Sequence, residues 1–182
     1  MANGRNIVIE LLPESAPNTV NSFIYTASRG YLDHHAIERI VPGNWVDVSY
    51  TAFGKKECRY LIPNEFELNP DVVPLDSHPG AVCMGGYGEA GLAGCEVFFP
   101  LRDCPDHKGI YPVFGRVLEG MDELYRLEKV ETVPVTDFPI EGVEVNRPVK
   151  PEIIERVELE LHGEIYPEPV RVREPELPEC WK

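Results

Sequence analysis

The amino-acid sequence predicts a mainly β domain, an antiparallel barrel or sandwich whose openings are covered by two helices. Short apolar runs that end at turn residues recur along the chain, whereas helical spacing of apolar residues occurs in one early and one late segment. Proline accounts for 18 of the 182 residues, which is about twice its usual share. Prolines at this density shorten helices and confine strands to edges and turns, which favours a β-rich domain.

Length and charge limit the classes of partner. A chain of 182 residues is long enough for one domain with its own core, with or without a tail. The formal net charge of −14 disfavours nucleic acid and anionic membranes as partners, because both bind basic surfaces. No apolar run is long enough to span a membrane and the first residues lack a signal-peptide pattern, so we expect a cytoplasmic protein. We also expect it to be a monomer.

The cysteines and histidines indicate neither a metal site nor a disulfide framework. The five cysteines form no Cys-x-x-Cys pair, and the five histidines show no His-x-x-x-His spacing. An odd number of cysteines without an export signal also argues against structural disulfides. The glycine-rich segment at 85–94 matches neither a phosphate-binding loop nor a dinucleotide-binding turn, so no cofactor is expected.

The first part of the chain predicts a strand, a helix and a pair of short strands. Residues 7–12 form an apolar run that ends at Pro13. A helix then begins near Pro17, carries one buried apolar stripe and ends at Gly30. Residues 36–48 predict two short strands on either side of a Pro-Gly turn, and residues 55–59 predict a loop.

The second part predicts further strands, a second helix and a tail. Strands are expected at 81–84, 97–99 and 113–117, and the last, half-buried one at 157–161; a helix is expected at 120–129. Residues 85–94 contain five glycines, which predicts an irregular segment that lies close to another backbone or a ligand. Residues 164–182 predict an extended segment, docked by Trp181, that the barrel does not need in order to fold.

Several segments also share a pattern with one protein family, in the same order along the chain. They are Ile7–Phe23, Gly30–Asp33, Ile37-Glu38-Arg39-Ile40-Val41-Pro42-Gly43, Asn64-Glu65-Phe66, Pro79–Met84, Gly94–Phe98 and Pro112–Met121. Together these segments resemble cyclophilin-type peptidyl-prolyl cis-trans isomerases. The resemblance implies an eight-stranded antiparallel β-barrel capped by two α-helices. It divides the chain into a cyclophilin-like domain at 1–163 and a Pro- and Glu-rich tail at 164–182.

The activity that this resemblance implies is rotation about the X–Pro bonds of peptides and proteins. The barrier to that rotation is about 18–20 kcal/mol, because rotation breaks amide resonance. The reaction needs no covalent nucleophile and no cofactor. Its site must hold the proline ring in an apolar pocket and present a fixed cation or hydrogen-bond donor to the twisted amide.

The resemblance also implies which residues carry the reaction. Arg39 stands at the position of the catalytic arginine, and Met84, Phe98 and Phe114 stand at pocket positions. Tyr111 replaces a histidine of the family and can still pack on a ring and donate a hydrogen bond. From the residues alone, the arginine would be read as an ordinary surface side chain and the apolar residues as core.

The chain departs from the family pattern close to Arg39. Asn44 stands where the family has a pocket aromatic residue. Trp45 replaces it only if the strand shifts by one residue, which would turn the side chain to the other face. Asp47 and Glu96 stand where the family has glutamines, and we expect both at the substrate site beside Arg39.

These departures leave two main hypotheses for function. The first is a peptidyl-prolyl cis-trans isomerase with reduced activity that acts on proline-containing peptides or protein clients. The second is a catalytically weak proline-peptide-binding or assembly module on the same fold. A metabolic enzyme on a related small barrel is disfavoured, because cofactor and metal motifs are missing.

Overall fold

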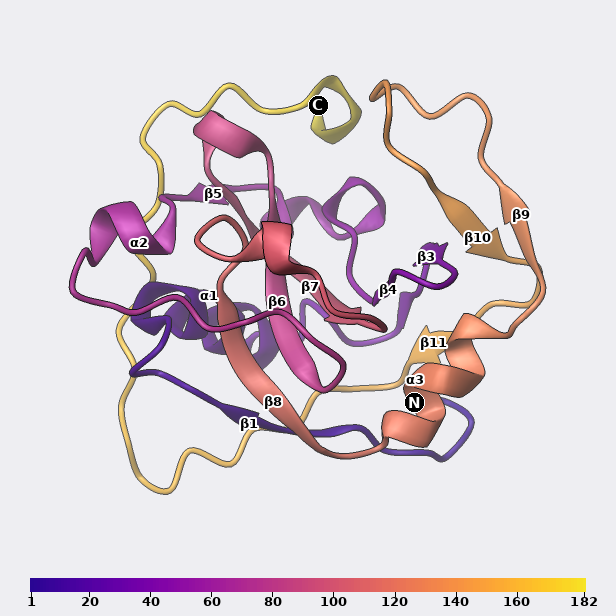
Figure 1. The fold of residues 1–182 in the computed structure, drawn as a ribbon, viewed down its shortest axis with the longest axis horizontal. Helices are drawn as coiled ribbons and strands as arrows, with labels where there is room; N and C mark the ends of the chain where they lie inside the picture. The colour runs from indigo at the N-terminus through magenta and orange to yellow at the C-terminus, as the bar shows by residue number, and fades with distance from the viewer.

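Seven strands form the central antiparallel sheet of the computed structural model, which describes residues 1–182 (Figure 1). Six of them pair in the order β1-β8-β6-β7-β4-β3, and β5 pairs with the other end of β7. Two further two-stranded sheets join β9 to β10 and β2 to β11. The predicted mainly β, antiparallel architecture is confirmed.

The elements have the following bounds. The strands are β1 Val8–Leu11, β2 His35–Ala36, β3 Arg39–Val41, β4 Trp45–Asp47, β5 Leu61–Ile62, β6 Ala81–Gly86, β7 Leu92–Pro100, β8 Val113–Glu119, β9 Thr132–Pro134, β10 Asn146–Pro148 and β11 Ile153–Ile154. The α-helices are α1 Pro17–Ser28, α2 Glu65–Leu68 and α3 Met121–Glu128. Short 3₁₀ turns lie at Thr51–Phe53, Lys56–Cys58, Gly88–Ala90, Pro105–His107 and Glu179–Trp181. None of these helices has the length and apolar character needed to cross a membrane.

The main sheet does not close into a ring of eight strands, because its edge strands β1 and β3 do not pair. The strand expected at 157–161 is also wrong: these residues are extended but belong to no sheet. Their alternating burial agrees with the sequence pattern, and Val157, Leu159 and Leu161 pack against the core. The backbone N–H of Val157 donates to the Asp33 carboxylate at 3.0 Å instead of to a neighbouring strand. A side chain therefore takes the place of a strand partner here.

Helices α1 and α3, the two predicted from apolar spacing, both contribute to the core. The stripe expected on α1 is buried, and Phe23 packs on Phe114 of β8 with ring centroids 5.4 Å apart. Helix α1 has no side-chain cap of its own at its N-terminus. The buried Glu65 carboxylate of α2 accepts hydrogen bonds there from the backbone N–H groups of Asn18 at 3.2 Å and Thr19 at 2.7 Å. A carboxylate at this end is favourable because the helix dipole is positive there.

The glycine-rich segment is more regular than expected. Residues 85–86 belong to β6 and residues 92–94 to β7, so the expectation of an irregular segment holds only for the turn between them. The expected close approach to another backbone is confirmed at Gly91, where a Cβ would lie 2.6 Å from the Ile62 carbonyl oxygen, whereas in the two strands the close neighbours are side chains. A Cβ at Gly94 would lie 2.2 Å from the Tyr60 ring, and one at Gly85 would lie 2.3 Å from the Glu96 carboxylate. Glycine is needed here because large neighbouring side chains fill the space above the strand.

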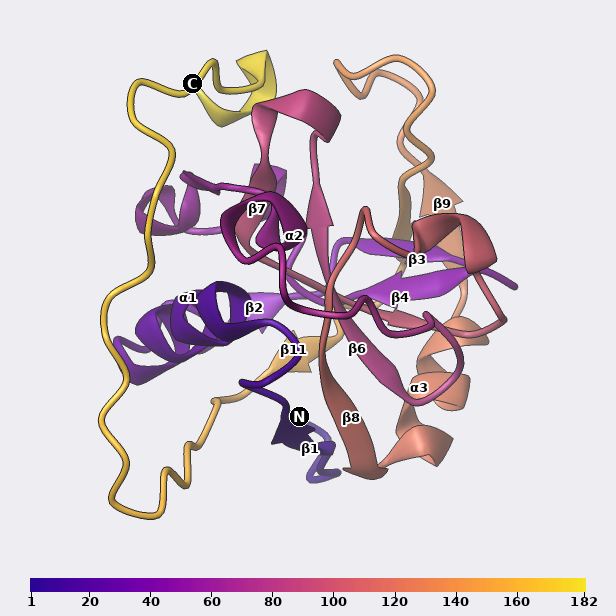
Figure 2. The same ribbon diagram turned by 60° about the vertical axis from the view of Figure 1, so that its left-hand side comes forward.

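The C-terminal segment packs along the outside of the domain. Figure 2 shows it passing α1 and ending near β7. The Asn18 side chain exchanges two hydrogen bonds with the Val170 backbone, at 2.7 and 3.1 Å, and the Val172 N–H donates to the Leu61 carbonyl at 2.9 Å. Trp181 is only 3% exposed and clusters with Leu61 and other apolar residues. Docking by Trp181 is confirmed, and this packing argues against the expectation that the barrel does not need the segment. The domain boundary at 163 stays a prediction.

We expect Trp181→Ala to lower the free energy of unfolding by about 3 kcal/mol, since a buried indole is lost from a packed cluster. Truncation after Gly163 should lower it at least as much. Urea unfolding followed by circular dichroism measures both. Ile165→Ala is the matched control, because Ile165 lies in the same segment and is 93% exposed. Unchanged stability in the truncated protein would show that the segment is only a surface attachment.

Candidate active site

The β3–β4 hairpin places Arg39, Trp45 and Asp47 on one face of the sheet. Arg39 pairs with Asp47 and Val41 with Trp45 across the hairpin. Side chains two residues apart on a strand share a face, so Trp45 and Asp47 project together. Gly43 turns the chain with φ +74°, a conformation that glycine adopts without strain.

The Arg39 side chain is held at several points and is 12% exposed. Its Nη1 donates to Asp47 Oδ2 at 3.0 Å, and its Nε donates to the backbone carbonyl of Glu144 at 2.8 Å. The guanidinium carbon lies 4.9 Å from the centre of the Tyr50 ring. These contacts fix the plane of the guanidinium, while Nη2 has no hydrogen bond within the protein and can donate to a ligand.

Strand β7 supplies the floor of the site. Phe98 pairs with Asp47 of β4, and Glu96 is two residues from Phe98, so both side chains lie on the Arg39 face. Glu96 is 5% exposed, and its Oε2 accepts a hydrogen bond from the Tyr87 hydroxyl at 3.3 Å. The absence of a side chain at Gly85 leaves room for this carboxylate.

Two buried carboxyl groups therefore lie near one guanidinium, and of the two only Asp47 forms an ion pair with it. Burial raises the pKa of Asp47 from its ordinary value of 3.8 to about 6, although the adjoining Arg39 opposes the shift. Burial and the neighbouring Asp47 carboxylate raise the pKa of Glu96 well above its ordinary value. Ionising both acids leaves one negative charge uncompensated in a desolvated site, which is unfavourable.

A cavity of about 180 Å³ opens beside Arg39. Four aromatic side chains gather at one end of it, namely Trp45, Phe98, His107 and Tyr111. Their ring centroids lie 4.9–6.2 Å apart in tilted or edge-to-face pairs. Burial lowers the pKa of His107, so this ring is neutral at pH 7 and packs as an aromatic group. The result is an apolar pocket with a fixed cation at its rim.

The structure brings together most of the predicted site residues. The cavity is lined by Arg39, Glu96, Phe98 and Tyr111. Asp47 does not line it but accepts a hydrogen bond from Arg39.

Three predicted residues lie elsewhere. Met84 pairs with Val97, whose side chain is on the opposite face from Glu96 and Phe98, so Met84 is fully buried in the core. Phe114 is also fully buried, against α1. Asn44 is in the exposed turn and accepts a hydrogen bond from Arg102 at 2.8 Å. None of the three lines the cavity.

Sequence reasoning missed several residues that do line it. They are Tyr50, Tyr87, His107, Ile140 and Val143. Trp45 was expected to reach the pocket only through a register shift; it lines the cavity because it is two residues from Asp47 and shares its face. Ile140 and Val143 lie about one hundred residues beyond Arg39 in the chain, and no local pattern indicates that this loop reaches the site.

Comparison with known proteins identifies the family. The sequence profile of cyclophilin-type peptidyl-prolyl cis-trans isomerases matches residues 1–167. The chain belongs to this family. It is similar to peptidyl-prolyl cis-trans isomerase-like 1 from Gibberella zeae, with 30% identity over 153 residues, 84% of this chain and 91% of that protein.

Other relatives are longer, and solved structures support the fold. The chain is 29% identical over 143 residues to mouse peptidylprolyl isomerase domain and WD repeat-containing protein 1, which is 77% of this chain but only 22% of that protein. A crystal structure of a Cryptosporidium parvum cyclophilin-type isomerase in the presence of the dipeptide Ala-Pro superposes with a TM-score of 0.63 at 18% identity, over 82% of this chain and 89% of that one. This likeness shows the cyclophilin fold.

The raised pKa of Glu96 predicts a pH-dependent loss of stability. Below pH 4 the group is protonated in both the folded and unfolded states. As pH rises, the unfolded state releases the proton first, so the free energy of unfolding falls by up to about 1.4 kcal/mol per pH unit until Glu96 ionises in the folded state. Glu96→Gln removes this loss.

We therefore expect the stability of Glu96→Gln relative to the unchanged protein to increase between pH 4 and pH 8. Urea unfolding at several pH values measures the difference. Tyr87→Phe, which removes the hydroxyl donor to Glu96 but leaves the carboxyl group in place, should keep the falling pH dependence. If the difference in free energy of unfolding between Glu96→Gln and the unchanged protein stayed constant with pH, the raised pKa of Glu96 would be contradicted.

Proposed function

We propose that this protein catalyses cis-trans isomerisation of X–Pro bonds in peptides and proteins. The observation that carries the proposal is the Arg39 guanidinium at the rim of a cavity whose inner end is aromatic. The aromatic rings accept the proline ring by apolar contact. The guanidinium is then beside the bond that must rotate.

The chemistry follows from the bond itself. When the X–Pro amide twists, its nitrogen becomes pyramidal and its lone pair, no longer delocalised into the carbonyl, localises on the nitrogen, where a cation or hydrogen-bond donor stabilises it. Arg39 Nη2 supplies that donor, because the other guanidinium contacts are already fixed by Asp47 and Glu144. A donor held in place before the substrate binds needs little reorganisation during rotation.

The two acids moderate this effect. Asp47 orients Arg39 through a 3.0 Å hydrogen bond. An ionised Glu96 lowers the positive potential at the twisted amide, so turnover below that of relatives with neutral amides at these positions is expected. The alternative of a proline-peptide-binding module rests on the same observation, and measured turnover separates the two. A cytoplasmic location and a monomeric state remain predictions.

Arg39→Ala should lower kcat/KM by about 10²–10³-fold, the size of effect seen when one preorganised transition-state donor is removed. Isomerisation of an Ala-Pro peptide, followed by a protease-coupled assay or by NMR exchange, gives the rate. Arg116→Ala is the matched control, since Arg116 is a strand arginine whose side chain is 63% exposed and forms an ion pair with Glu10. Equal rates in Arg39→Ala and the unchanged protein would exclude Arg39 as the catalytic residue.

At a pH where Glu96 is ionised, Glu96→Gln should raise kcat/KM about tenfold, which corresponds to about 1.4 kcal/mol of transition-state stabilisation. The substitution keeps the shape of the side chain and removes a negative charge close to Arg39. The gain should be largest above the pH at which Glu96 ionises. A fall in kcat/KM with an intact circular dichroism spectrum would show that the carboxylate supports Arg39 instead.

A further inference from the structure

A hairpin from outside the main sheet reaches the active site. It comprises residues 132–148, that is β9, β10 and the loop between them, and is called here the 132–148 hairpin. Figures 1 and 2 both show it rising beside β3 and β4. In the two strands Thr132 pairs with Pro148, and Pro134 pairs with Asn146. The Val135 N–H extends this ladder by donating a hydrogen bond to the Val145 carbonyl at 2.9 Å.

The hairpin is anchored at its base and along its loop. Arg147 forms an ion pair with Glu38, the residue before Arg39, and its guanidinium lies over the Phe53 ring. The ring of Phe138 packs against Tyr50 and Phe53, with centroids 5.6 and 5.9 Å away. Contacts at both ends hold the loop against the site in a defined position.

The same hairpin touches the catalytic machinery directly. The backbone carbonyl of Glu144 accepts the 2.8 Å hydrogen bond from Arg39 Nε, and the side chains of Ile140 and Val143 line the cavity. The aromatic end of the cavity is built by β4, β7 and the 107–111 segment. The lining therefore includes an aromatic group, called here the aromatic wall, and the pair Ile140 and Val143, called the aliphatic wall, besides Tyr50, Tyr87 and Glu96.

We propose that the 132–148 hairpin is a specificity element and that Ile140 and Val143 select the residue that flanks the proline. This inference rests on the proposed isomerase function. With the proline ring on the aromatic wall and its amide beside Arg39, the adjoining substrate residue lies next to the aliphatic wall. That wall favours a large apolar side chain. The buried Glu96 and the exposed Glu141 and Glu144 disfavour an acidic one.

Two series of peptides test this selection, one varying the residue before proline and one varying the residue after it. In each series the flanking residue is Ala, Leu or Glu, and kcat/KM is measured for the full chain. We expect Leu to exceed Ala and Ala to exceed Glu in at least one series. The double variant Ile140→Ala/Val143→Ala should lower the Leu-to-Ala ratio of kcat/KM about tenfold, the scale on which a missing methylene group changes selectivity.

Two matched proteins separate selection from a general loss of structure. Ile140→Val/Val143→Ile exchanges the two aliphatic groups and should restore most of the ratio. Val133→Ala removes the same two methyl groups as Val143→Ala from an outward-facing residue of the same hairpin, 49% exposed, and should leave the ratio unchanged. A uniform loss of kcat/KM for all peptides in the double alanine variant, or an unchanged ratio, overturns the inference.

The two proposals fail in different ways. If the unchanged protein accelerates no X–Pro peptide, the isomerase function is refuted. The selection is then measured as the ratio of dissociation constants for the same peptides by calorimetry, and it must show the same dependence on Ile140 and Val143. If turnover is present and the ratio does not respond to these residues, only the specificity assignment is wrong.

Discussion

The geometry of the site depends on the buried ion pair between Arg39 and Asp47. Asp47 has a side chain that is 1% exposed, and Arg39 Nη1 lies 3.0 Å from it. Removing either partner would leave a charge without compensation in a desolvated site, which is strongly unfavourable. The pair holds the guanidinium in one orientation, and the Glu144 carbonyl and the ring of Tyr50 then restrict it from other sides. A fixed cation beside an apolar cavity is the property on which the proposed chemistry depends.

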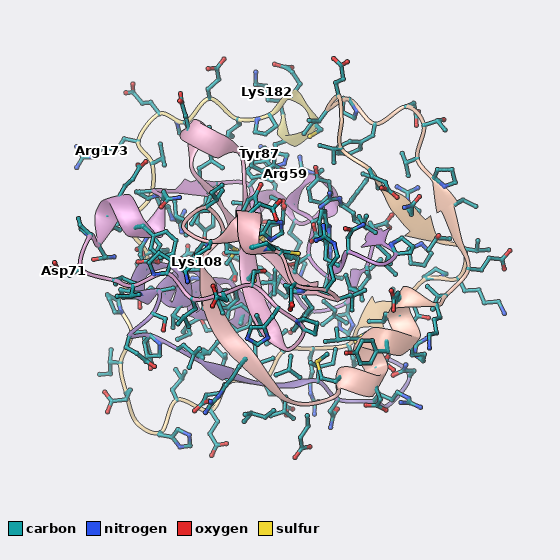
Figure 3. All side chains as sticks on the ribbon, viewed as in Figure 1. Arg59, Asp71, Tyr87, Lys108, Arg173 and Lys182 are labelled. Carbon is teal, nitrogen blue, oxygen red and sulfur yellow. The ribbon has the colours of Figure 1, made fainter.

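Glu96 makes this site electrostatically different from one with a neutral amide at the same place. It is buried with a hydroxyl donor from Tyr87, and Tyr87 in turn packs edge-to-face on Trp181 with ring centroids 5.0 Å apart. Figure 3 shows Tyr87 and Arg59 close to the C-terminal turn, where Arg59 donates to the Trp181 carbonyl at 3.1 Å. The docked tail is thereby in contact with Tyr87, which lines the cavity beside Arg39. Tyr87 therefore links the tail to the site, because it packs on Trp181 and donates a hydrogen bond to the Glu96 carboxyl group.

The aromatic and aliphatic walls of the cavity have separate origins in the chain. The aromatic wall comes from the main sheet and the segment before β8, and the aliphatic wall comes from a hairpin after α3. A site assembled in this way can change its selectivity by changes in the hairpin while the barrel strands and Arg39 are retained. In the proposed function the apolar pocket and the cation carry the reaction, and in the further inference the hairpin selects the substrate.

The sequence by itself determined the main strands and the two principal helices, and its resemblance to the family predicted that Arg39, Asp47, Glu96, Phe98 and Tyr111 lie together, as they do around the cavity. These follow from local patterns, since alternation and turn residues fix strands and ordered motifs fix their place in the fold. Only the tertiary structure decided that Met84 and Phe114 face the core, because the choice of face depends on the register between β6 and β7. Likewise, only packing decided that the ring of strands stays open, that Trp181 is buried and that Ile140 and Val143 reach Arg39. Contacts between segments far apart in the chain leave no periodic signal in either segment, so composition and spacing cannot reveal them.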